Sequence, residues 1–239
     1  MLLYYVRHGD PIYNPDSLTE LGHTQAEALA KRLSILGFDK IYASSSNRAR
    51  QTAEPTCRAL GMEAEILDWC NEGYAWRDLT ITGENGNKCW AFQDQRTRLF
   101  LTGREMRALG DAWYDHPFFD GTAFKSGFQR IERETDSFMA SLGFIHDREN
   151  NCYTVAKPVY SRVALFAHQG FGLAFLSALC DIPYPEFCTR FDIGHTGVTV
   201  IRIQGNEGEK CIPKILQLSN DSHLYKEGVS TKYQNLFEL

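Results

Sequence analysis

The chain has 239 residues and carries 25 lysine and arginine side chains against 30 aspartate and glutamate side chains, which gives a net charge of -5. This acidic balance excludes a protein that holds nucleic acid through general attraction to phosphates, so any affinity for an anion must be local. The length suits one well-buried α/β domain with an elaboration. Because no Pro-, Gly- or Ser-rich stretch and no block of like charge marks a linker, we expect a single domain over residues 1–239.

Cysteine usage and the N-terminal sequence favour a cytoplasmic protein. The seven cysteines are odd in number and include no C-x-x-C pair, which is typical of reduced thiols rather than of a disulfide framework or a zinc site. The chain does not open with a basic segment, an apolar stretch and a cleavage site. Residues 163–180 are mostly apolar, but His168, Gln169, Gly170 and Gly172 interrupt them as a strand, loop and helix would, so we expect no membrane span there.

The N-terminal part of the chain predicts a strand followed by a helix. The apolar run Leu2–Val6 has the length and composition of a buried strand. Ser17 and Glu20 have the spacing of a capping box, and the apolar period that follows them predicts a helix as far as Gly37. Such a helix would cover one face of a sheet.

Later patterns continue this alternation and predict an α/β fold. A strand over 40–43 precedes a helix over 47–60, which Gly61 stops. Further strands are expected over 163–167, 198–203 and 214–218, and a further helix over 171–180. The alternation predicts a three-layer α/β/α architecture with a mostly parallel central sheet and right-handed crossovers.

The middle of the chain, about 75–160, departs from this pattern, and we expect a mainly helical insertion that packs over the ligand crevice. Its residues 75–125 combine many aromatic side chains with arginines. Two interpretations are open for the aromatic residues. They form the insertion's own core, with the arginines as its solvated face, or Trp76 and Trp90 stack on a substrate ring.

Two histidines directly follow two of the expected strands. Arg7 and His8 come after the first strand, and His168 comes after the strand at 163–167. In open α/β sheets, the loops beyond the carboxyl ends of the strands form the ligand crevice. We therefore expect both histidines at one rim, where they are placed for chemistry on a small molecule.

These residues and several further segments resemble the histidine phosphatase superfamily, which includes the phosphoglycerate mutase-like enzymes. Arginine-histidine-glycine at 7–9 and histidine-x-glycine at 168–170 are typical of that family. Residues 18–26 resemble its leucine-threonine-x-x-glycine-x-x-glutamine-alanine stretch, and residues 44–53 resemble its serine-x-x-x-arginine-alanine-x-x-threonine-alanine segment. The resemblance implies a phosphoglycerate mutase-like fold. Because the middle third does not match, it also implies that the insertion chooses the substrate.

The resemblance further implies catalysis through a phosphohistidine on His8. The neutral imidazole would attack phosphorus in line, and water would then hydrolyse the intermediate. Arg7, Arg48 and His168 would hold the equatorial oxygens, His168 as an imidazolium, because arginine binds phosphate oxygens in bidentate fashion and stays charged.

A carboxylic acid must also protonate the departing alkoxide and later help to activate water. Glu72 lies about where the family carries its acid, after the second helix and third strand, and is our first choice for this role. The surrounding segment matches the family loosely, so Asp68 stays open as the alternative acid.

Three further residues are candidates for substrate binding. Asn14 lies where the family often has an asparagine four positions after an acidic residue; it either binds phosphate or closes an Asx turn before Pro15. Ser44 either contacts substrate or fixes its loop. His195 comes in a turn before the strand at 198–203, and either lines the pocket or has no role there.

We expect neither a cofactor nor a metal ion. Two histidines and a carboxylate also suit hydrolases that activate water on zinc. A dication would be repelled by Arg7 and Arg48 in a site of low dielectric, however, and the chain has no H-x-x-x-H spacing.

The first functional hypothesis is a metal-independent phosphomonoesterase that hydrolyses a small phosphorylated metabolite. A phosphoglycerate mutase-type phosphotransferase is the alternative, although Gly73 and Phe171 stand where the glycolytic mutases carry characteristic residues. A non-catalytic module that binds a phosphorylated ligand is the alternative from another class. The expected partner is a small phosphate ester rather than nucleic acid or a membrane. The oligomeric state stays open, with a homodimer as one alternative.

Overall fold

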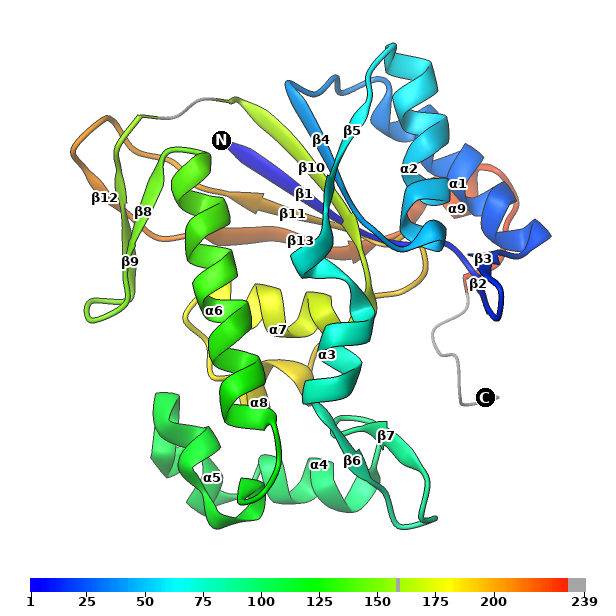
Figure 1. The fold of residues 1–239 in the computed structure, drawn as a ribbon. Helices are drawn as coiled ribbons and strands as arrows, with labels where there is room; N and C mark the ends of the chain where they lie inside the picture. The colour runs from blue at the N-terminus through cyan, green and yellow to red at the C-terminus, as the bar shows by residue number, and fades with distance from the viewer. Residues whose placement is uncertain (158–159, 232–239) are drawn as a thin grey trace.

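The computed structural model describes residues 1–157 and 160–231, and a six-stranded sheet forms its centre (Figure 1). The strands, in spatial order, are β13 (Lys214–Asn220), β11 (Val198–Arg202), β1 (Leu2–Arg7), β10 (Arg162–Ala167), β4 (Lys40–Ser44) and β5 (Ala64–Leu67). Strands β1, β10, β4 and β5 pair in parallel, whereas β11 is antiparallel to both of its neighbours. The predicted mostly parallel sheet is confirmed. The predicted insertion at about 75–160 includes residues 158–159, and the predicted domain over 1–239 includes residues 232–239. These residues lie outside the described ranges.

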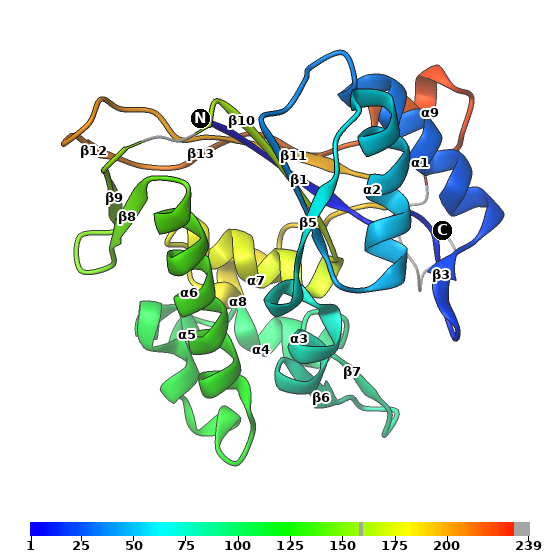
Figure 2. The same ribbon diagram turned by 45° about the horizontal axis from the view of Figure 1, so that its top comes forward.

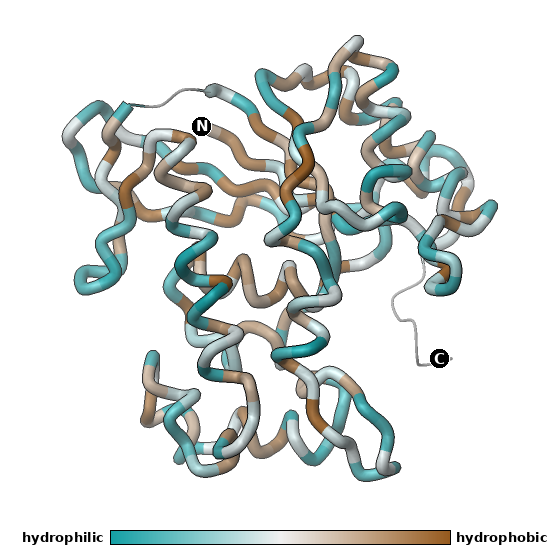
Figure 3. Tube along the Cα trace, in the orientation of Figure 1, coloured by the Kyte–Doolittle hydropathy of each residue, from teal (hydrophilic) through white to brown (hydrophobic). Residues whose placement is uncertain are grey.

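Helices cover both faces of this sheet (Figure 2). One face carries α1 (Glu20–Leu33), α2 (Asn47–Leu60) and α9 (Ser222–Lys226), and the other carries α6 (Phe124–Ser141) and α7 (Gln169–Leu179). The central strands are hydrophobic along their length because they are buried on both sides (Figure 3). No helix in the described ranges is long and apolar enough to cross a membrane.

The start and end of α1 differ from the sequence prediction. Its N-cap is Thr19, whose Oγ1 accepts a hydrogen bond from the backbone N–H of Gly22 across 3.0 Å. Ser17 instead lies in a short strand, so the predicted capping box was wrong. The helix ends at Leu33, well before Gly37, because the chain leaves the helix in a turn over 34–36.

The second predicted helix is confirmed, and its C-terminus shows the expected physical cause. Helix α2 ends at Leu60, and Gly61 adopts the left-handed conformation with φ of 64°. Its backbone N–H bonds back to the last turn. A residue with a Cβ atom would be strained in this conformation.

Several short hairpins were not predicted. They are β2 (Pro11–Tyr13) with β3 (Asp16–Leu18), β6 (Thr80–Thr82) with β7 (Lys88–Trp90), and β8 (Phe144–Asp147) with β9 (Cys152–Val155), which also pairs with β12 (Lys210–Cys211). Strands of two to four residues carry too little periodicity to stand out in a sequence.

The expected helical insertion is present between β5 and β8. Its helices are α3 (Glu72–Asp78), α4 (Gln95–Leu101), α5 (Arg104–Leu109), three-residue and six-residue 3-10 helices, and α6. Helices α3 to α5 and the β6–β7 hairpin lie beyond the end of the sheet where α7 begins (Figure 1). The hairpin β8–β9 lies away from them, beside β12 (Figure 1).

Much of the insertion's aromatic content forms its own core, as one of the two interpretations predicts. Trp113 is buried and contacts Phe119, Phe128 and Tyr184, with ring centroids 5.1, 5.2 and 5.5 Å away. The arginines of this region are exposed: Arg77, Arg96, Arg98, Arg104 and Arg107. Trp76 and Trp90 differ, because both line a cavity described below.

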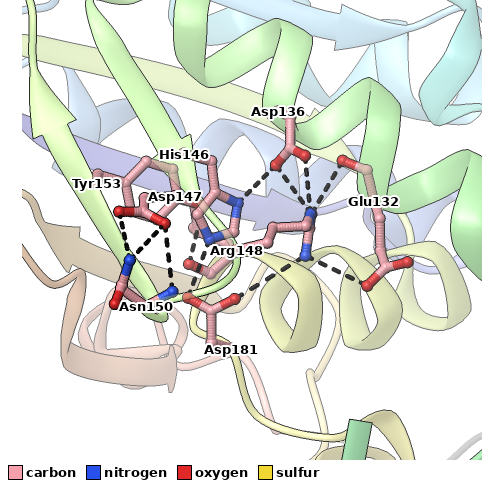
Figure 4. A network of polar contacts seen from close by, with 9 residues as sticks. Glu132, Asp136, His146, Asp147, Arg148, Asn150, Tyr153 and Asp181 are labelled. Carbon is pink, nitrogen blue, oxygen red and sulfur yellow. Dashed lines mark hydrogen bonds and ion pairs between the residues drawn. The ribbon is translucent and has the colours of Figure 1, made fainter. Parts of the chain in front are cut away.

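A polar network joins α6, β8 and the end of α7 (Figure 4). The His146 ring lies between Asp136 and Asp181, at 2.6 and 3.0 Å, and stacks on Tyr153 with ring centroids 4.1 Å apart. Burial opposes the charged form of this imidazole, but the two carboxylates outweigh burial and raise the pKa of His146 above its ordinary value. Arg148 completes the network by bonding Asp136 through two nitrogens. The network fixes the C-terminal part of α6 to β8 and to the end of α7.

Candidate active site

The site forms where the carboxyl ends of β1, β10 and β4 lie side by side. Because these strands are parallel neighbours, the residues that follow them reach the same edge of the sheet. The rings of His8 and His168 lie there with centroids 5.2 Å apart, and His195 lies 5.8 Å from His8. The prediction that two strands deliver two histidines to one rim is confirmed.

His8 is held as a neutral ring with one nitrogen available. Its Nδ1 lies 2.7 Å from the carbonyl oxygen of Gly9, and a carbonyl accepts only, so Nδ1 carries the proton and donates it. Nε2 then keeps its lone pair. Burial, together with the positive charges of Arg7 and Arg48 and the nearby His168, holds the pKa of His8 well below its ordinary value. The ring is therefore suited to act as a nucleophile.

Arg7 is buried and fixed by two hydrogen bonds. Its Nη1 donates to the carbonyl of Ile193 across 2.7 Å, and its Nη2 donates to Nε2 of His195 across 2.9 Å. On its other side, Nδ1 of His195 lies 3.5 Å from a carboxylate oxygen of Asp10. His195 does not line the cavity, so its place in the site is behind Arg7 rather than against a ligand.

Arg48 comes from the first turn of α2 and points back to the β2–β3 hairpin. Its Nη1 donates to Oδ1 of Asp16 across 2.6 Å, and its guanidinium lies 5.4 Å from the ring centroid of Tyr13. Sequence reasoning missed Asp16 and Tyr13, because only the folded hairpin brings them to the helix. They hold the guanidinium at the edge of the cavity.

His168 is fully buried, and two serine hydroxyls lie near one of its ring nitrogens. Nε2 lies 2.8 Å from Oγ of Ser44 and 3.1 Å from Oγ of Ser46. Burial, followed by the charges of Arg48 and Arg7, holds the pKa of His168 well below its ordinary value. This lowered pKa favours the neutral form of His168 over the imidazolium that the sequence analysis expects.

Ser44 and Tyr5 fix the position of His168 from two sides. Ser44 is buried and is not part of the cavity wall, in agreement with the interpretation that it fixes its loop. The hydroxyl of Tyr5 donates to the carbonyl of His168 across 2.6 Å and accepts from its N–H across 3.1 Å. Sequence reasoning missed Tyr5, although a tyrosine inside a buried strand needs a partner for its hydroxyl.

Glu72 begins α3 and faces the first turn of α7. Its two carboxylate oxygens accept hydrogen bonds from the backbone N–H groups of Gly170 and Phe171, each across 2.9 Å. Burial raises the pKa of Glu72, and the two N–H groups and nearby arginines reduce this rise without reversing it. A carboxyl group with a raised pKa is suited to donate a proton near neutral pH.

Asp68 has a different environment. Its carboxylate accepts hydrogen bonds from the hydroxyls of Ser45, across 2.6 Å, and Tyr74, across 2.8 Å. These bonds lower the pKa of Asp68, and the residue does not line the cavity. Of the two candidate acids, Glu72 has the position and the protonation tendency that the role requires.

Asn14 does not reach the site. It lies exposed in the turn between β2 and β3 and is not part of the cavity wall. The hairpin instead offers Tyr13 and Asp16, one and two positions away, to Arg48. The interpretation of Asn14 as a turn residue agrees with this placement better than the phosphate-binding interpretation does.

Arg7, His8, Arg48 and Glu72 lie in the wall of a cavity of about 610 Å³. Its lining residues are Arg7, His8, Tyr13, Asp16, Ser46, Arg48, Asn71, Glu72, Gly73, Trp76, Trp90, Gln93 and Gln169. The charged part of this wall comes from the end of β1, the β2–β3 hairpin, α2 and α3, and the insertion supplies the tryptophans. Within the described ranges, groups of three or more His, Cys, Asp or Glu side chains arranged to hold a metal ion are absent.

Comparison with known proteins agrees with this fold. A model of the histidine phosphatase superfamily (branch 1) matches residues 3–109. An adenosylcobalamin/alpha-ribazole phosphatase of Salmonella typhi is 26% identical over 199 residues, covering 77% of this chain and 81% of the relative. A protein of Hydrogenobacter thermophilus that carries the name phosphoserine phosphatase 2 is 22% identical over 214 residues, covering 86% and 91%.

Solved structures show the same architecture. A mycobacterial glucosyl-3-phosphoglycerate phosphatase superimposes with a TM-score of 0.56 at 20% identity, covering 91% of this chain and 98% of the other. A phosphoserine phosphatase of Entamoeba histolytica superimposes with a TM-score of 0.57 at 18% identity, covering 93% and 98%. Residues 3–109 match the histidine phosphatase superfamily, and the sheet and the two strand-end histidines agree with that match.

Proposed function

We propose that this protein is a phosphomonoesterase that works through a phosphohistidine on His8 and hydrolyses a small phosphate ester. One observation carries the proposal. The cavity presents the unprotonated Nε2 of His8 next to the buried arginines Arg7 and Arg48, with the carboxyl group of Glu72 on the same wall. A nucleophile, a cationic phosphate pocket and an acid are the groups that hydrolysis of a phosphate ester requires.

In the first step, Nε2 of His8 attacks phosphorus, and the bond between phosphorus and the alcohol oxygen breaks. Arg7 and Arg48 stabilise the charge on the equatorial oxygens. Glu72, protonated because burial raises its pKa, gives its proton to the departing oxygen. The alcohol leaves, and His8 carries the phosphoryl group.

In the second step, Glu72 is a carboxylate and accepts a proton from water as the water oxygen attacks phosphorus. The phosphorus–nitrogen bond breaks, which returns His8 to its neutral form and releases phosphate. The bond from Nδ1 of His8 to the Gly9 carbonyl persists through both steps and stabilises the positive ring of the intermediate. No step draws on a cofactor or a metal ion.

His168 takes part through a change of protonation in this proposal. Burial and the two arginines favour its neutral form. A phosphoryl dianion in the cavity would offset these charges and raise the pKa of His168. The ring is not part of the cavity wall, but its Nε2 lies 3.1 Å from Oγ of Ser46, which is, so its charge would act on the phosphoryl group beside Ser46. Ser44 and Tyr5 would keep the ring in place.

The charges of the cavity support hydrolysis over the mutase alternative. A phosphoglycerate carries a carboxylate that needs a cation besides those that grip the phosphoryl group. The cations of the cavity wall are Arg7 and Arg48, and Gly73 follows the proposed acid without any side chain. The wall therefore offers a second anion little attraction.

The proposal also treats residues 1–239 as a single domain, in which the insertion at about 75–160 selects the substrate. Trp76, Trp90 and Gln93 of this insertion line the cavity and support that division of labour. The free cysteines of the described residues support a reducing compartment, for which we propose the cytoplasm. A homodimer is compatible with the fold and remains a separate hypothesis for sedimentation measurements.

The test is phosphate release by the wild type, His8→Ala and His23→Ala, with a chelator present. His23 is exposed on α1 and serves as the matched histidine control. We expect release by the wild type and His23→Ala and loss of at least about a thousandfold in His8→Ala. Trapping with radiolabelled substrate should give an acid-labile, base-stable phosphoprotein. Release by His8→Ala at the wild-type rate would exclude His8 as the nucleophile.

A further inference from the structure

The cavity is larger than a phosphoryl group needs. Its volume of about 610 Å³ lies in the range of pockets that hold whole organic ligands, roughly 300–1,000 Å³. Arg7, His8 and Arg48 occupy one part of its wall. The remaining volume is available to the alcohol part of the ester. The residues that line this volume therefore indicate the chemistry of the leaving group.

One part of this remaining wall is a pair of tryptophans from the insertion. Trp76 of α3 and Trp90 of β7 meet edge to face, with ring centroids 5.1 Å apart and planes at 81°. Trp76 is 37% exposed although it lies beside the cavity, so part of its ring is uncovered. A partly exposed indole at a cavity is suited to contact another aromatic ring.

Trp90 is fixed against the first turn of α7. Its ring stacks on Phe92 with centroids 5.6 Å apart, and it lies so close to Gly170 that a Cβ atom there would come within 2.4 Å of it. Gly170 is also a donor to Glu72. The tryptophan pair is thereby positioned against the residues that carry out the chemistry, and not on a separate surface.

A further aromatic side chain comes from a different part of the chain. Tyr13 of β2 is 65% exposed, lines the same cavity, and contacts the Arg48 guanidinium with its ring. Rings from the β2–β3 hairpin and from the insertion therefore share one cavity. The neutral side chains Asn71, Gln93 and Gln169 line the same wall.

The charges of the wall indicate an uncharged leaving group. Its two cations, Arg7 and Arg48, are adjacent to the nucleophile and are used by the phosphoryl group, whereas Asp16 is acidic and Glu72 is neutral in the first step of the proposed function. A further carboxylate on the leaving group would be desolvated without a further cation in the wall. Lys88 places its ammonium 5.7 Å from the Trp76 ring centroid, but it is not part of the cavity wall.

We propose that the substrate is the phosphate ester of an uncharged alcohol that carries an aromatic ring, and that this ring binds against Trp76 and Trp90. This inference rests on the proposed phosphatase function and specifies its substrate class. Two sources have this chemistry: a simple arylalkyl alcohol and a nucleoside, whose base supplies the ring.

The experiment compares kcat/KM among esters of alkyl alcohols, so that the acidity of the alcohol does not decide the result. The esters are 2-phenylethyl phosphate, propyl phosphate, adenosine 5'-monophosphate, phosphoserine and 3-phosphoglycerate. We expect 2-phenylethyl phosphate or adenosine 5'-monophosphate to exceed propyl phosphate and both carboxylated esters by about tenfold or more. Whichever of the two aromatic esters ranks higher identifies the source of the ring.

Trp76→Ala should lower the ratio of kcat/KM for the preferred aromatic ester to that for propyl phosphate by about tenfold. Tyr74→Ala is the matched control, because Tyr74 lies on the same helix, is 36% exposed and does not line the cavity. It should leave the ratio unchanged. Lys88→Ala should leave the discrimination against phosphoserine unchanged, since Lys88 does not face the cavity.

Equal kcat/KM for 2-phenylethyl, adenosine and propyl esters would overturn the inference, as would a preference for phosphoserine or 3-phosphoglycerate. If His8→Ala abolishes the release of phosphate from these esters, either result would overturn the substrate class and leave the proposed phosphatase function intact. Failure of all five esters to release phosphate with a folded wild-type protein would overturn both.

Discussion

The guanidinium of Arg7 donates a hydrogen bond from Nη2 to Nε2 of His195 across 2.9 Å. Because this nitrogen accepts, His195 is neutral and carries its proton on Nδ1, which faces the Asp10 carboxylate at 3.5 Å. The chain from Asp10 through His195 fixes the direction in which Arg7 presents its remaining N–H groups. His195 is thus a positioning residue for Arg7.

We predict that His195→Ala weakens inhibition by inorganic phosphate, and lowers kcat/KM, by about tenfold, the effect of losing one hydrogen bond to a charged group. His195→Gln should recover much of both quantities, because its side-chain oxygen can accept from Nη2. The measurement is the inhibition constant of phosphate for the three proteins. Equal values for the alanine and glutamine variants would contradict the positioning role.

The variant Glu72→Gln tests whether Glu72 gives the proton to the departing alcohol oxygen. We expect kcat for an alkyl phosphate to fall by about 10²–10⁴-fold, because glutamine has no acidic proton to give and keeps an acceptor oxygen for only one of the two backbone N–H groups of Gly170 and Phe171. The loss should be smaller for 4-nitrophenyl phosphate, whose leaving group departs without a proton. Asp68→Asn is the control and should keep wild-type rates; a large loss there would favour Asp68 as the acid.

The raised pKa of Glu72 also predicts a pH dependence. The acid must be protonated in the first step, so the rate with an alkyl phosphate should fall as pH rises through the pKa of Glu72. Because burial raises this pKa above its ordinary value, the fall occurs at a higher pH than for an exposed carboxyl group. The pH profile of kcat for the wild type should show this basic limb, and that of Glu72→Gln should lack it.

Gly170→Ala tests the contact between Trp90 of the insertion and the first turn of α7. A Cβ atom at this position would meet the Trp90 ring at 2.4 Å, so we expect a loss of about 1–3 kcal/mol in the free energy of unfolding and a lower kcat. Urea unfolding measures the first quantity. Combining the change with Trp90→Leu should recover part of the loss, because the two side chains share one space.

Without that contact, the same substitution would have the opposite effect. Gly170 lies in α7, where alanine is favoured over glycine by about 1 kcal/mol. A stabilised Gly170→Ala protein would therefore contradict the close approach of Trp90.

His223 should make the protein less stable in acid. Burial and the nearby Arg32 lower its pKa to about 4 in the folded protein, against 6.5 as its ordinary value. As pH falls below 6.5, the unfolded chain takes up a proton that the folded protein does not, so folding loses stability until pH reaches the folded pKa. The contribution of His223 should fall by roughly 2 kcal/mol between pH 7 and pH 5.

The difference between the wild type and His223→Gln isolates this effect from other titrating groups. Glutamine keeps a group that can bond to Oγ1 of Thr196, the partner of the His223 ring at 3.0 Å. Urea unfolding at the two pH values should show a smaller drop in the variant. An equal drop would place the acid sensitivity elsewhere.

Local patterns identified the residues that stand at the ends of strands. His8 and His168 were predictable because a buried strand is a continuous apolar run and the residue after it must emerge at the edge of the sheet. Arg48 was predictable in the same way from the start of α2. The N-cap residue of α1 was not predictable, because Ser17 and Thr19 both offer a hydroxyl before the helix. The pairing of β3 with β2 decides between them.

The sequence by itself determined the order of strands and helices and the residues that emerge at their ends, since these follow from periodicity and turn chemistry along the chain. Tertiary structure decided the partners: Asp16 on Arg48, Tyr5 on His168, His195 behind Arg7, and Trp90 against Gly170. These contacts join residues from 32 to 188 positions apart. Their formation depends on which elements become neighbours in space, and no periodicity along a single segment encodes that. Tertiary packing also sets the low pKa of His8 and the raised pKa of Glu72, because the burial that causes both shifts exists only once the elements have packed together.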